Sequence, residues 1–446
     1  MTTPDRPAVR VLLVSRIFAP EPAAASFRLR ALTDALDEAG AHVTVLTTTS
    51  SRAMAGEPDG TREGVVVRRR PVLRDADGYV RGYLQYMSFD IPAFFRVLLS
   101  PGFDVVVNEP PPTTGFMVRL ACAVRRRPYV YYVCDILGDA VGTTNAPGVV
   151  VRVVRAVEGW AWRGARALLS VSGGVTRRLA ELGVRDGVHE VGNGIDTAAF
   201  TPDGDAVDLA ADDGVTTPYF VYAGTASEVH GAGVFARAML LVHAQHPRAR
   251  LVFIGQGAEK AAIAAECASL PPGTVTFLPQ APAQEVARWL RGAVASLASV
   301  RPGGGYDFSF PTKVYASVAC GTPAVYAGIG PARTLVADER LGHAVDYDDD
   351  AVAAAMLAAL AAPADERLGS AVDYDDDAVA GAMLAALAED ARERAGERVP
   401  TPRADDPGVE TRDERQARLA AWAAQNASLA GVARDAARVV IAAASR

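Results

Sequence analysis

Residues 9–47 read VRVLLVSRIFAPEPAAASFRLRALTDALDEAGAHVTVLT and contain a complete strand–helix–strand unit. Val9–Val14 is a short, continuous apolar run of the kind that forms a buried strand. Ser26–Ala39 has apolar residues at helical spacing and stops at Gly40, and a second β-branched run follows at Ala41–Thr47. Buried strands that do not alternate between apolar and polar residues, joined by helices, indicate a parallel sheet covered on both faces.

The same alternation of strand and helix continues outward from this unit. It next includes Phe103–Val107, Phe116–Arg126, Tyr129–Val133, Val149–Arg163 and Ala167–Val171. After the acidic stretch 201–218 come the predicted strands Tyr219–Ala223, Leu251–Ile254, Val275–Phe277, Ala295–Leu297 and Pro323–Tyr326. We therefore expect an α/β protein with two doubly wound, Rossmann-like domains, and a ligand at the carboxyl ends of the strands in the cleft between the domains.

The predicted boundaries follow shifts in composition. We assign residues 1–200 to the first domain, 201–218 to a linker, 219–411 to the second domain and 412–446 to a C-terminal helical segment. The stretch 390–411, rich in Arg, Asp, Gly and Pro, reads as a second linker. The helical segment carries a docking face made of Leu419, Trp422, Leu429, Val432, Val439 and Val440.

A tandem duplication lies near the end of the second domain. Residues 337–361 recur as residues 364–388 with two differences, His343/Ser370 and Ala354/Gly381. Two copies do not make a solenoid, so we expect the second copy to be a peripheral insertion. Each copy reads as a short strand followed by a helix capped by Asp350 or Asp377. The DYDDD runs lack the glycine turn and distal glutamate of a calcium loop, which favours a solvated turn.

Composition and charge exclude several classes of protein. With 45 Lys and Arg against 52 Asp and Glu, the net charge is −7, so no overall basic field favours a nucleic acid partner. Four cysteines without a CxxC pair indicate neither a disulfide framework nor a zinc site. The first apolar run is too short for a signal or a membrane span. We therefore expect a cytoplasmic location.

Several further segments carry a family resemblance. They are LLVSRIFAPEPAAASFRLRALTDAL from Leu12, YYVCDILGDAV from Tyr131, SVSGGVTRRLAELGV from Ser170, VGNGIDTAAF from Val191 and PTKVYASVACGTPAV from Pro311. In order and spacing they resemble the family-four retaining glycosyltransferases, especially the bacterial cell-surface polysaccharide branch. The resemblance implies a GT-B fold with the nucleotide sugar on the second domain and the acceptor on the first. It also implies a C-terminal helix that crosses back to the first domain.

The donor site must stabilise the diphosphate that leaves when a sugar nucleotide breaks at the anomeric carbon. Lys313 opens a predicted helix entered through Pro311, and its charge could act there without a metal. Because the sequence has no metal-ligand cluster, we expect neither a metal nor another cofactor. Together with Lys313 and His230, the predicted donor-side residues are Gly224, Thr225, Gly255, Gly257, Gln280, Ala281, Arg301, Asp307, Ser309 and Thr312.

The chain departs from the family pattern around this site. Thr225 and His230 stand where many members carry Arg and Lys. Phe308 and Ala316 stand where they carry two glutamates, the second of which grips the ribose. Asp307 is the candidate replacement for the first glutamate. Arg301 is the candidate that replaces the positive charge lost at Thr225 and His230.

Three residues of the first domain are candidates for the acceptor side. Asp135, after a predicted strand, would orient the acceptor or help to deprotonate it, or else cap a turn. Glu21 and Arg28 would contact the acceptor or the diphosphate, or else form a surface pair or anchor a loop.

The first domain also carries a candidate membrane patch. It combines Arg68–Arg70 and Arg125–Arg127 with Tyr79, Tyr83, Tyr86, Phe89, Phe94 and Phe95. A basic, aromatic surface would suit a lipid-linked acceptor at the inner face of the membrane, whereas aromatic residues at helical spacing also fit a buried core.

The sequence thus predicts a metal-independent glycosyltransferase with a nucleotide-sugar donor, a glycan or lipid-linked acceptor and no nucleic acid partner. A non-hydrolysing sugar-nucleotide epimerase of similar fold is the alternative, favoured by nucleotide release without an acceptor. A non-catalytic sugar-nucleotide binder is a third hypothesis, motivated by Phe308 and Ala316. An oxidoreductase is disfavoured, because no GxGxxG follows the first strand.

Overall fold

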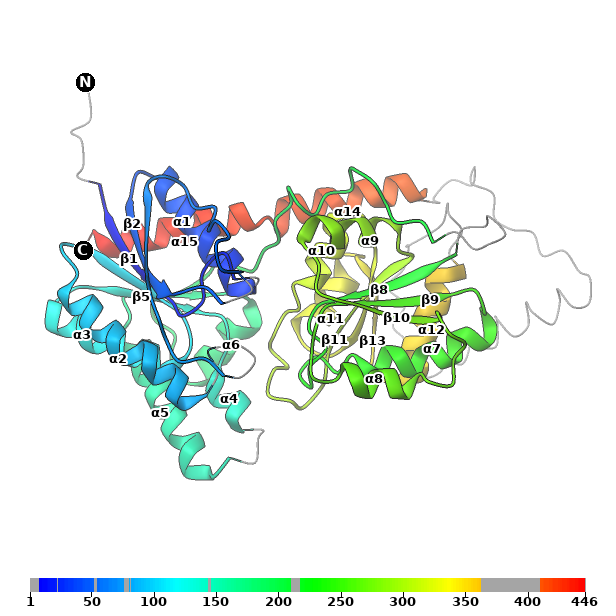
Figure 1. The fold of residues 1–446 in the computed structure, drawn as a ribbon, viewed down its shortest axis with the longest axis horizontal. Helices are drawn as coiled ribbons and strands as arrows, with labels where there is room; N and C mark the ends of the chain where they lie inside the picture. The colour runs from blue at the N-terminus through cyan, green and yellow to red at the C-terminus, as the bar shows by residue number, and fades with distance from the viewer. Residues whose placement is uncertain are drawn as a thin grey trace, which may run out of the picture. The chain divides into compact units, whose positions relative to one another are not determined.

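The computed structural model describes residues 8–21, 23–51, 54–75, 80, 82–142, 146–209, 217–361 and 410–445. The chain divides into two compact units, each built around one parallel sheet (Figure 1). Unit 1 comprises residues 1–194 and 429–446, and unit 2 comprises residues 195–428. The predicted pair of doubly wound α/β domains is thus confirmed.

The sheet of unit 1 has seven strands, and every neighbouring pair is parallel. In sheet order they are β3 (Val65–Arg70), β2 (His42–Thr48), β1 (Arg10–Val14), β4 (Val105–Asn108), β5 (Tyr129–Val133), β6 (Ala167–Ser170) and β7 (Val188–Glu190). The order reverses between β1 and β4, which is where such sheets bind ligands. Two strands were not predicted: β3 is a half-exposed edge strand whose second half is three arginines, and β7 has only three residues.

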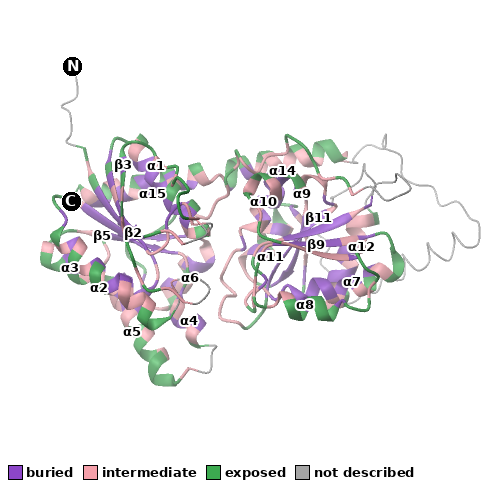
Figure 2. Ribbon diagram, in the orientation of Figure 1, coloured by how far each residue is buried: buried purple, intermediate pink, exposed green. Residues whose placement is uncertain are grey.

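Helices cover both faces of this sheet. One face carries α1 (Ala24–Glu38) and α15 (Leu429–Ala444), which pack against each other (Figure 1). The other carries α2 (Tyr83–Leu99), α3 (Pro112–Arg125) and α5 (Gly148–Gly164). Two shorter helices, α4 (Leu137–Gly142) and α6 (Gly173–Glu181), complete the unit. Figure 2 shows the strands buried between exposed helix surfaces.

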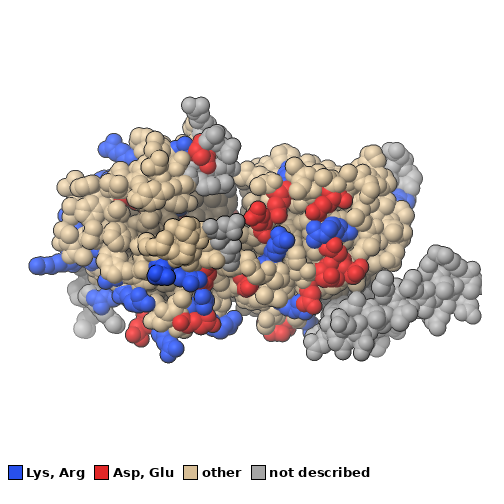
Figure 3. All heavy atoms as spheres, turned by 90° about the horizontal axis from the view of Figure 1, so that it is seen from below, with Lys and Arg blue, Asp and Glu red and all other residues tan. Residues whose placement is uncertain are grey.

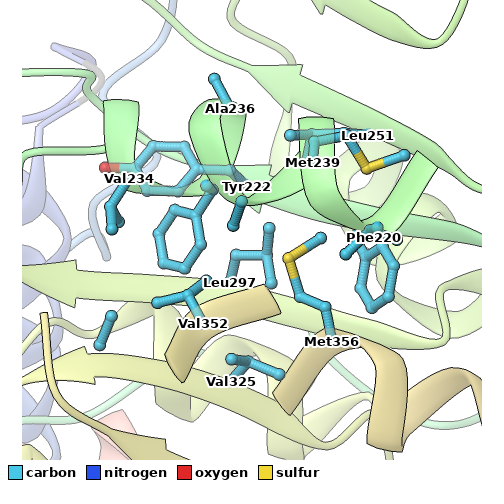
Figure 4. Close-up of a cluster of buried hydrophobic side chains, with 14 of the residues drawn as sticks. Phe220, Tyr222, Val234, Ala236, Met239, Leu251, Leu297, Val325, Val352 and Met356 are labelled. Carbon is cyan, nitrogen blue, oxygen red and sulfur yellow. The ribbon is translucent and has the colours of Figure 1, made fainter. Parts of the chain in front are cut away.

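Unit 2 contains a six-stranded parallel sheet. In sheet order its strands are β10 (Val275–Leu278), β9 (Arg250–Ile254), β8 (Tyr219–Ala223), β11 (Ala295–Val300), β12 (Ala324–Gly328) and β13 (Gly342–Val345). Its helices are α7 (Gly233–Gln245), α8 (Lys260–Glu266), α9 (Ala283–Gly292), α10 (Lys313–Ala319), α11 (Pro331–Asp338), α12 (Asp349–Ala361) and α14 (Arg412–Asn426). Figure 4 shows an apolar cluster of this unit, where Phe220, Leu251 and Leu297 of the strands meet Met239 of α7 and Met356 of α12.

The C-terminal segment forms two helices that serve different units. We predicted one docking face, but Leu419 of α14 is buried in unit 2, whereas Val432 and Val440 of α15 are buried in unit 1. The chain breaks between the helices at Ala427, whose carbonyl accepts a 2.8 Å hydrogen bond from the Ile195 amide. The last helix therefore returns to the first unit, as expected. Residues 195–200 belong to unit 2, because Ile195 and Phe200 pack against its core.

The duplicated segment is described only in its first copy, which contributes β13 and α12. Asp348, rather than the predicted Asp350, caps α12, since its Oδ1 accepts hydrogen bonds of 3.0 Å from the amides of Asp350 and Ala351. The second copy, residues 364–388, lies outside the described residues, as does most of the predicted linker 390–411. The peripheral position of that copy stays a prediction.

Candidate functional site

The strand order of unit 2 reverses between β8 and β11, and candidate donor residues surround this point. Gly224 and Thr225 follow β8 directly, and Arg301 follows β11. The loops after the two strands touch, because the Arg301 amide donates a 2.9 Å hydrogen bond to the carbonyl of Val229. In doubly wound sheets a crevice opens outside the carboxyl ends of such strands. Four predicted residues, Gly224, Thr225, His230 and Arg301, thus lie at one point of the sheet.

The side chain of Lys313, the first residue of α10, extends to this same point of the sheet. Its Nζ donates a 2.7 Å hydrogen bond to the Tyr222 hydroxyl and lies 4.1 Å from the centroid of that ring. The alkyl chain passes over Gly224, where a Cβ atom would lie 3.1 Å from Cε of Lys313. Burial lowers the pKa of the amine to about 7. The lysine is therefore poised to take up a proton when an anion approaches.

His230 lies in the turn between β8 and α7. Its Nδ1 shares a 2.9 Å hydrogen bond with Oγ of Ser227, and its carbonyl accepts a 2.6 Å bond from Ser299. The positive charge of Lys313, together with burial, lowers the pKa of His230 to about 3. The imidazole is thus neutral near pH 7, so it can donate or accept a hydrogen bond but does not supply the positive charge of the lysine it replaces.

Gly255 and Gly257 let two loops pack backbone against backbone. Both have positive φ, 137° and 148°. A Cβ atom at Gly255 would lie 2.3 Å from the Gly224 carbonyl oxygen, and one at Gly257 would lie 2.0 Å from that of Ala226. These glycines therefore shape the candidate site by holding the loops after β8 and β9 together.

The remaining donor-side candidates are spread along the rim of unit 2. Gln280 and Ala281 follow the edge strand β10, with β9 between them and β8. Asp307 closes its own loop, since Oδ1 accepts a 3.0 Å bond from the Gly303 amide. Ser309 and Thr312 lie in the segment that enters α10. Phe308 stacks on Tyr306, with 6.4 Å between ring centroids, and Ala316 is buried in the core. Replacement of the first family glutamate by Asp307 stays a prediction.

The reversal point of unit 1, between β1 and β4, holds a buried ion pair. Arg28 of α1 donates a 2.9 Å hydrogen bond to Oε2 of Glu109, and the two side chains are only 9% and 6% exposed. Ser15, directly after β1, donates to Oε1 of Glu109 at 2.8 Å. The Arg28 guanidinium also lies 5.1 Å from the centroid of the Tyr132 ring. Arg28 is therefore built into the floor of the site, and contact with an acceptor stays a prediction.

Asp135 lies two residues beyond the end of β5 and is exposed. The surrounding protein limits its hydration and raises its pKa, against the opposing charge of Arg28. The turn that follows is held by Glu158 of α5, whose oxygens accept 2.9 Å bonds from the amides of Leu137 and Gly138. Burial raises the pKa of Glu158 to about 7, although those two amides oppose the shift. Asp135 thus has access to solvent on a rigidly held turn.

Glu21, by contrast, anchors a loop. Its oxygens accept bonds from the Ser51 amide at 2.6 Å, the Ser51 hydroxyl at 3.1 Å and Arg74 at 3.4 Å. Of the roles considered for Glu21, this geometry supports the loop anchor.

Three residues of these sites were not predicted: Tyr222, Glu109 and Glu158. Tyr222 was treated only as part of a strand, although a tyrosine at the carboxyl end of a buried strand needs a partner for its hydroxyl. Glu109 directly follows β4 and precedes three prolines, which places an acid at a strand end and could have identified it. Glu158 had no comparable signal.

The described residues hold no group of three or more His, Cys, Asp or Glu side chains able to bind a metal ion. None of the helices in the described part of the chain is long and apolar enough to cross a bilayer.

Two family models match the chain. Residues 24–194 match a glycosyl transferase 4-like domain, and residues 217–362 match the glycosyl transferases group 1. A curated relative, the D-inositol 3-phosphate glycosyltransferase of Jonesia denitrificans, is 31% identical over 172 residues. That alignment covers 35% of this chain and 38% of the relative.

Two solved structures share the architecture. The sucrose-phosphate synthase of Thermosynechococcus elongatus aligns with a TM-score of 0.65 and 18% identity, over 87% of this chain and 100% of that one. Anabaena HepE in complex with UDP-glucose aligns with a TM-score of 0.60 and 14% identity, over 97% and 99%. The predicted GT-B fold is confirmed by this likeness and by the two sheets.

Proposed function

The chain belongs to the GT4-type glycosyltransferases, and from this premise we propose that it moves a sugar from a nucleotide-diphosphate donor to a glycan or lipid-linked acceptor, with retention of anomeric configuration. The proposal rests on the position of Lys313 at the reversal point of the unit 2 sheet. There its amine donates a hydrogen bond to the Tyr222 hydroxyl, and its alkyl chain passes over Gly224. We place the reaction in the cytoplasm or at the inner face of the membrane, in the synthesis of a surface polysaccharide or other envelope glycan.

In the proposed reaction the bond between the anomeric carbon and the phosphate oxygen breaks, and negative charge grows on the departing diphosphate. Protonated Lys313 stabilises that charge, and neutral His230 offers a hydrogen bond from the opposite loop. Asp135 orients the acceptor hydroxyl, whose proton passes to the departing phosphate. Because Anabaena HepE was solved with UDP-glucose, uridine diphosphate sugars are the first donors to test.

Purified protein should release nucleoside diphosphate from one donor only when a suitable acceptor is present. Each nucleotide sugar would be incubated with and without glycan and lipid-linked acceptors, and both the free nucleotide and the glycosylated product would be measured. Nucleotide release without acceptor, together with an epimerised sugar, would assign the chain to the epimerases instead. Tight nucleotide binding without turnover in any mixture would support a non-catalytic binder.

We expect transfer to proceed without a divalent ion. Lys313 supplies the charge that a metal would otherwise place on the diphosphate. Initial rates in EDTA should equal those in Mg²⁺ or Mn²⁺. Activity abolished by EDTA and restored by either ion would refute this.

The affinity for a nucleoside diphosphate should fall as the pH rises above about 7. Diphosphate favours the charged amine of Lys313, whose pKa without ligand is about 7, so at higher pH binding must take up a proton. The dissociation constant should then rise by up to about tenfold per pH unit. Calorimetry at pH 8 in buffers of different ionisation enthalpy would measure that proton directly. The matched variant Lys313→Met should bind weakly and show no such pH dependence; a wild-type affinity constant from pH 6.5 to 9 would exclude the mechanism.

A further inference from the structure

The helices α2, α3 and α5 form one outer layer over a face of the unit 1 sheet, and their exposed charges have a single sign. α2 packs against α3, and α3 packs against α5. The only acidic residues in these three helices, Asp90 and Glu158, are 0% and 2% exposed. The arginines are Arg96, Arg119, Arg125, Arg152, Arg155 and Arg163. Figure 3 views the molecule from the side of this layer, where blue side chains are prominent on unit 1.

The same layer exposes ten large apolar side chains. They are between 40% and 78% exposed and comprise Tyr83, Leu84, Ile91, Phe95, Leu99, Leu120, Val124, Val149, Val150 and Val153. On α2, Ile91, Phe95 and Leu99 recur every four residues and so share one side of the helix. Single exposed apolar residues are ordinary on a protein surface, whereas a group from three adjacent helices marks an interaction surface.

The opposite helical layer of the same unit differs in charge. There acidic and basic residues are mixed: α1 carries Asp34, Asp37 and Glu38 with Arg30, and α15 carries Asp435 with Arg434 and Arg438. Exposed helix charges of a single, positive sign are therefore found on one of the two helical layers of unit 1, in a chain whose net charge is −7.

The layer reaches the edge of the sheet where the acceptor-side residues lie. Arg16, just beyond β1, stacks on Tyr86 of α2 at 4.2 Å from the ring centroid, which places the beginning of α2 at this edge. Arg155 of α5 donates a 3.2 Å bond to the Gly138 carbonyl, in the turn that follows Asp135. The beginning of α2 and the middle of α5 thus lie on the same edge as Asp135.

We propose that the layer formed by α2, α3 and α5 is a docking surface for an anionic lipid bilayer. Arg96, Arg119 and Arg125 donate hydrogen bonds to backbone carbonyls. The apolar side chains would enter the interfacial region, and the exposed arginines Arg152, Arg155 and Arg163 would face lipid phosphates, with which guanidinium groups form paired hydrogen bonds. A bilayer is favoured over a protein because exposed arginines and exposed large apolar side chains are spread together over three helices, and a surface that is both basic and apolar binds at the interface of an anionic membrane. That the bilayer also presents the acceptor to Asp135 rests on the proposed function; the docking itself does not.

The full-length protein should sediment with vesicles of phosphatidylcholine mixed with phosphatidylglycerol, and not with vesicles of phosphatidylcholine alone. Added salt should weaken the binding, because it screens the arginines. No nucleotide sugar is present in this assay. Binding without transfer from any donor would therefore overturn the proposed function alone, and absence of binding to the mixed vesicles would overturn the docking surface alone.

Two double variants would locate the surface. Leu84→Gln with Val153→Gln removes apolar side chains and should lower the partition coefficient by about tenfold or more. Arg126→Gln with Arg152→Gln, one just beyond α3 and one on α5, should lower it about twentyfold, since each basic residue near an anionic surface contributes about fivefold. The matched control Leu241→Gln with Arg434→Gln, on α7 and α15, should bind as wild type.

Equal binding of the layer variants and the wild type would overturn the assignment of this surface. So would light scattering that shows a wild-type dimer which Leu84→Gln with Val153→Gln converts to a monomer, because the layer would then be covered by a second copy of the chain. Circular dichroism of each variant would verify that the fold is kept.

Discussion

Replacing Lys313 by methionine is expected to lower turnover by about 10²- to 10³-fold while leaving unit 2 folded. Methionine keeps an unbranched chain over Gly224 and removes the charge together with the hydrogen bond to the Tyr222 hydroxyl. One unit charge about 4 Å from a leaving oxygen contributes about 4 kcal/mol at an effective dielectric constant near 20. The fold should persist because the Tyr222 hydroxyl retains its 3.1 Å hydrogen bond to the Thr225 carbonyl.

Steady-state kinetics of Lys313→Met, with thermal melting as a check on folding, would decide the point. Lys260→Met is a matched control, because the Lys260 amine donates its hydrogen bonds to the backbone carbonyls of Gly255 and Leu278. It should lose stability rather than catalysis. Near-normal turnover in Lys313→Met would show that the diphosphate is held elsewhere, with Arg301 as the first residue to examine.

Breaking the pair of Arg28 and Glu109 should lower the free energy of unfolding by about 3–5 kcal/mol. Arg28→Met leaves the Glu109 carboxylate buried with Ser15 as its hydrogen-bond donor, and Glu109→Gln leaves the guanidinium charge without its counter-ion. Each single variant therefore leaves one buried charge without its partner and without water. The double variant Arg28→Met with Glu109→Leu should recover most of the loss, because buried pairs can often be exchanged for apolar residues.

Denaturant unfolding of the two single variants and the double variant would give the coupling energy. Arg62 offers the comparison, since it pairs at 2.9 Å with Asp37 and Glu38 on the surface with about half its side chain exposed. Arg62→Ala should cost less than about 1 kcal/mol. An equally small effect of Arg28→Met would mean that the pair is not buried in solution.

The fold was predictable because parallel strands buried on both faces have a strong local signal. Val11–Val14 and Tyr129–Val133 are continuous apolar runs that can be recognised without knowing their partner strands. The edge strand β3 was not predicted because its second half is three arginines, which fit neither a buried nor an apolar pattern. The break between the last two helices at Ala427 was not predicted, because no Gly or Pro lies at that position. Only the hydrogen bond to its carbonyl from the Ile195 amide shows it.

The site was less predictable because its chemistry depends on contacts between distant residues. The motif around Lys313 predicts its position at the donor site. Its partner Tyr222 lies 91 residues away in the sequence, so no local pattern could identify the pair. The charge state of His230 follows from the nearby amine of Lys313, so no reading of His230 alone could show that it is neutral. Likewise Arg28 appeared as a ligand contact, whereas Glu109, 81 positions further on, makes it half of a buried pair.

The return of α15 to unit 1 has a consequence for the order in which the protein can fold during synthesis. Domains near the N-terminus generally fold first as a chain emerges. Here unit 1 lacks a helix with six buried residues, packed on α1, β4, β5 and β6, until residues 429–444 have been synthesised. Unit 2 is continuous in the chain and can be complete while unit 1 still has an uncovered apolar face. The strands of unit 1 therefore leave the ribosome before those of unit 2, but their unit is completed after unit 2.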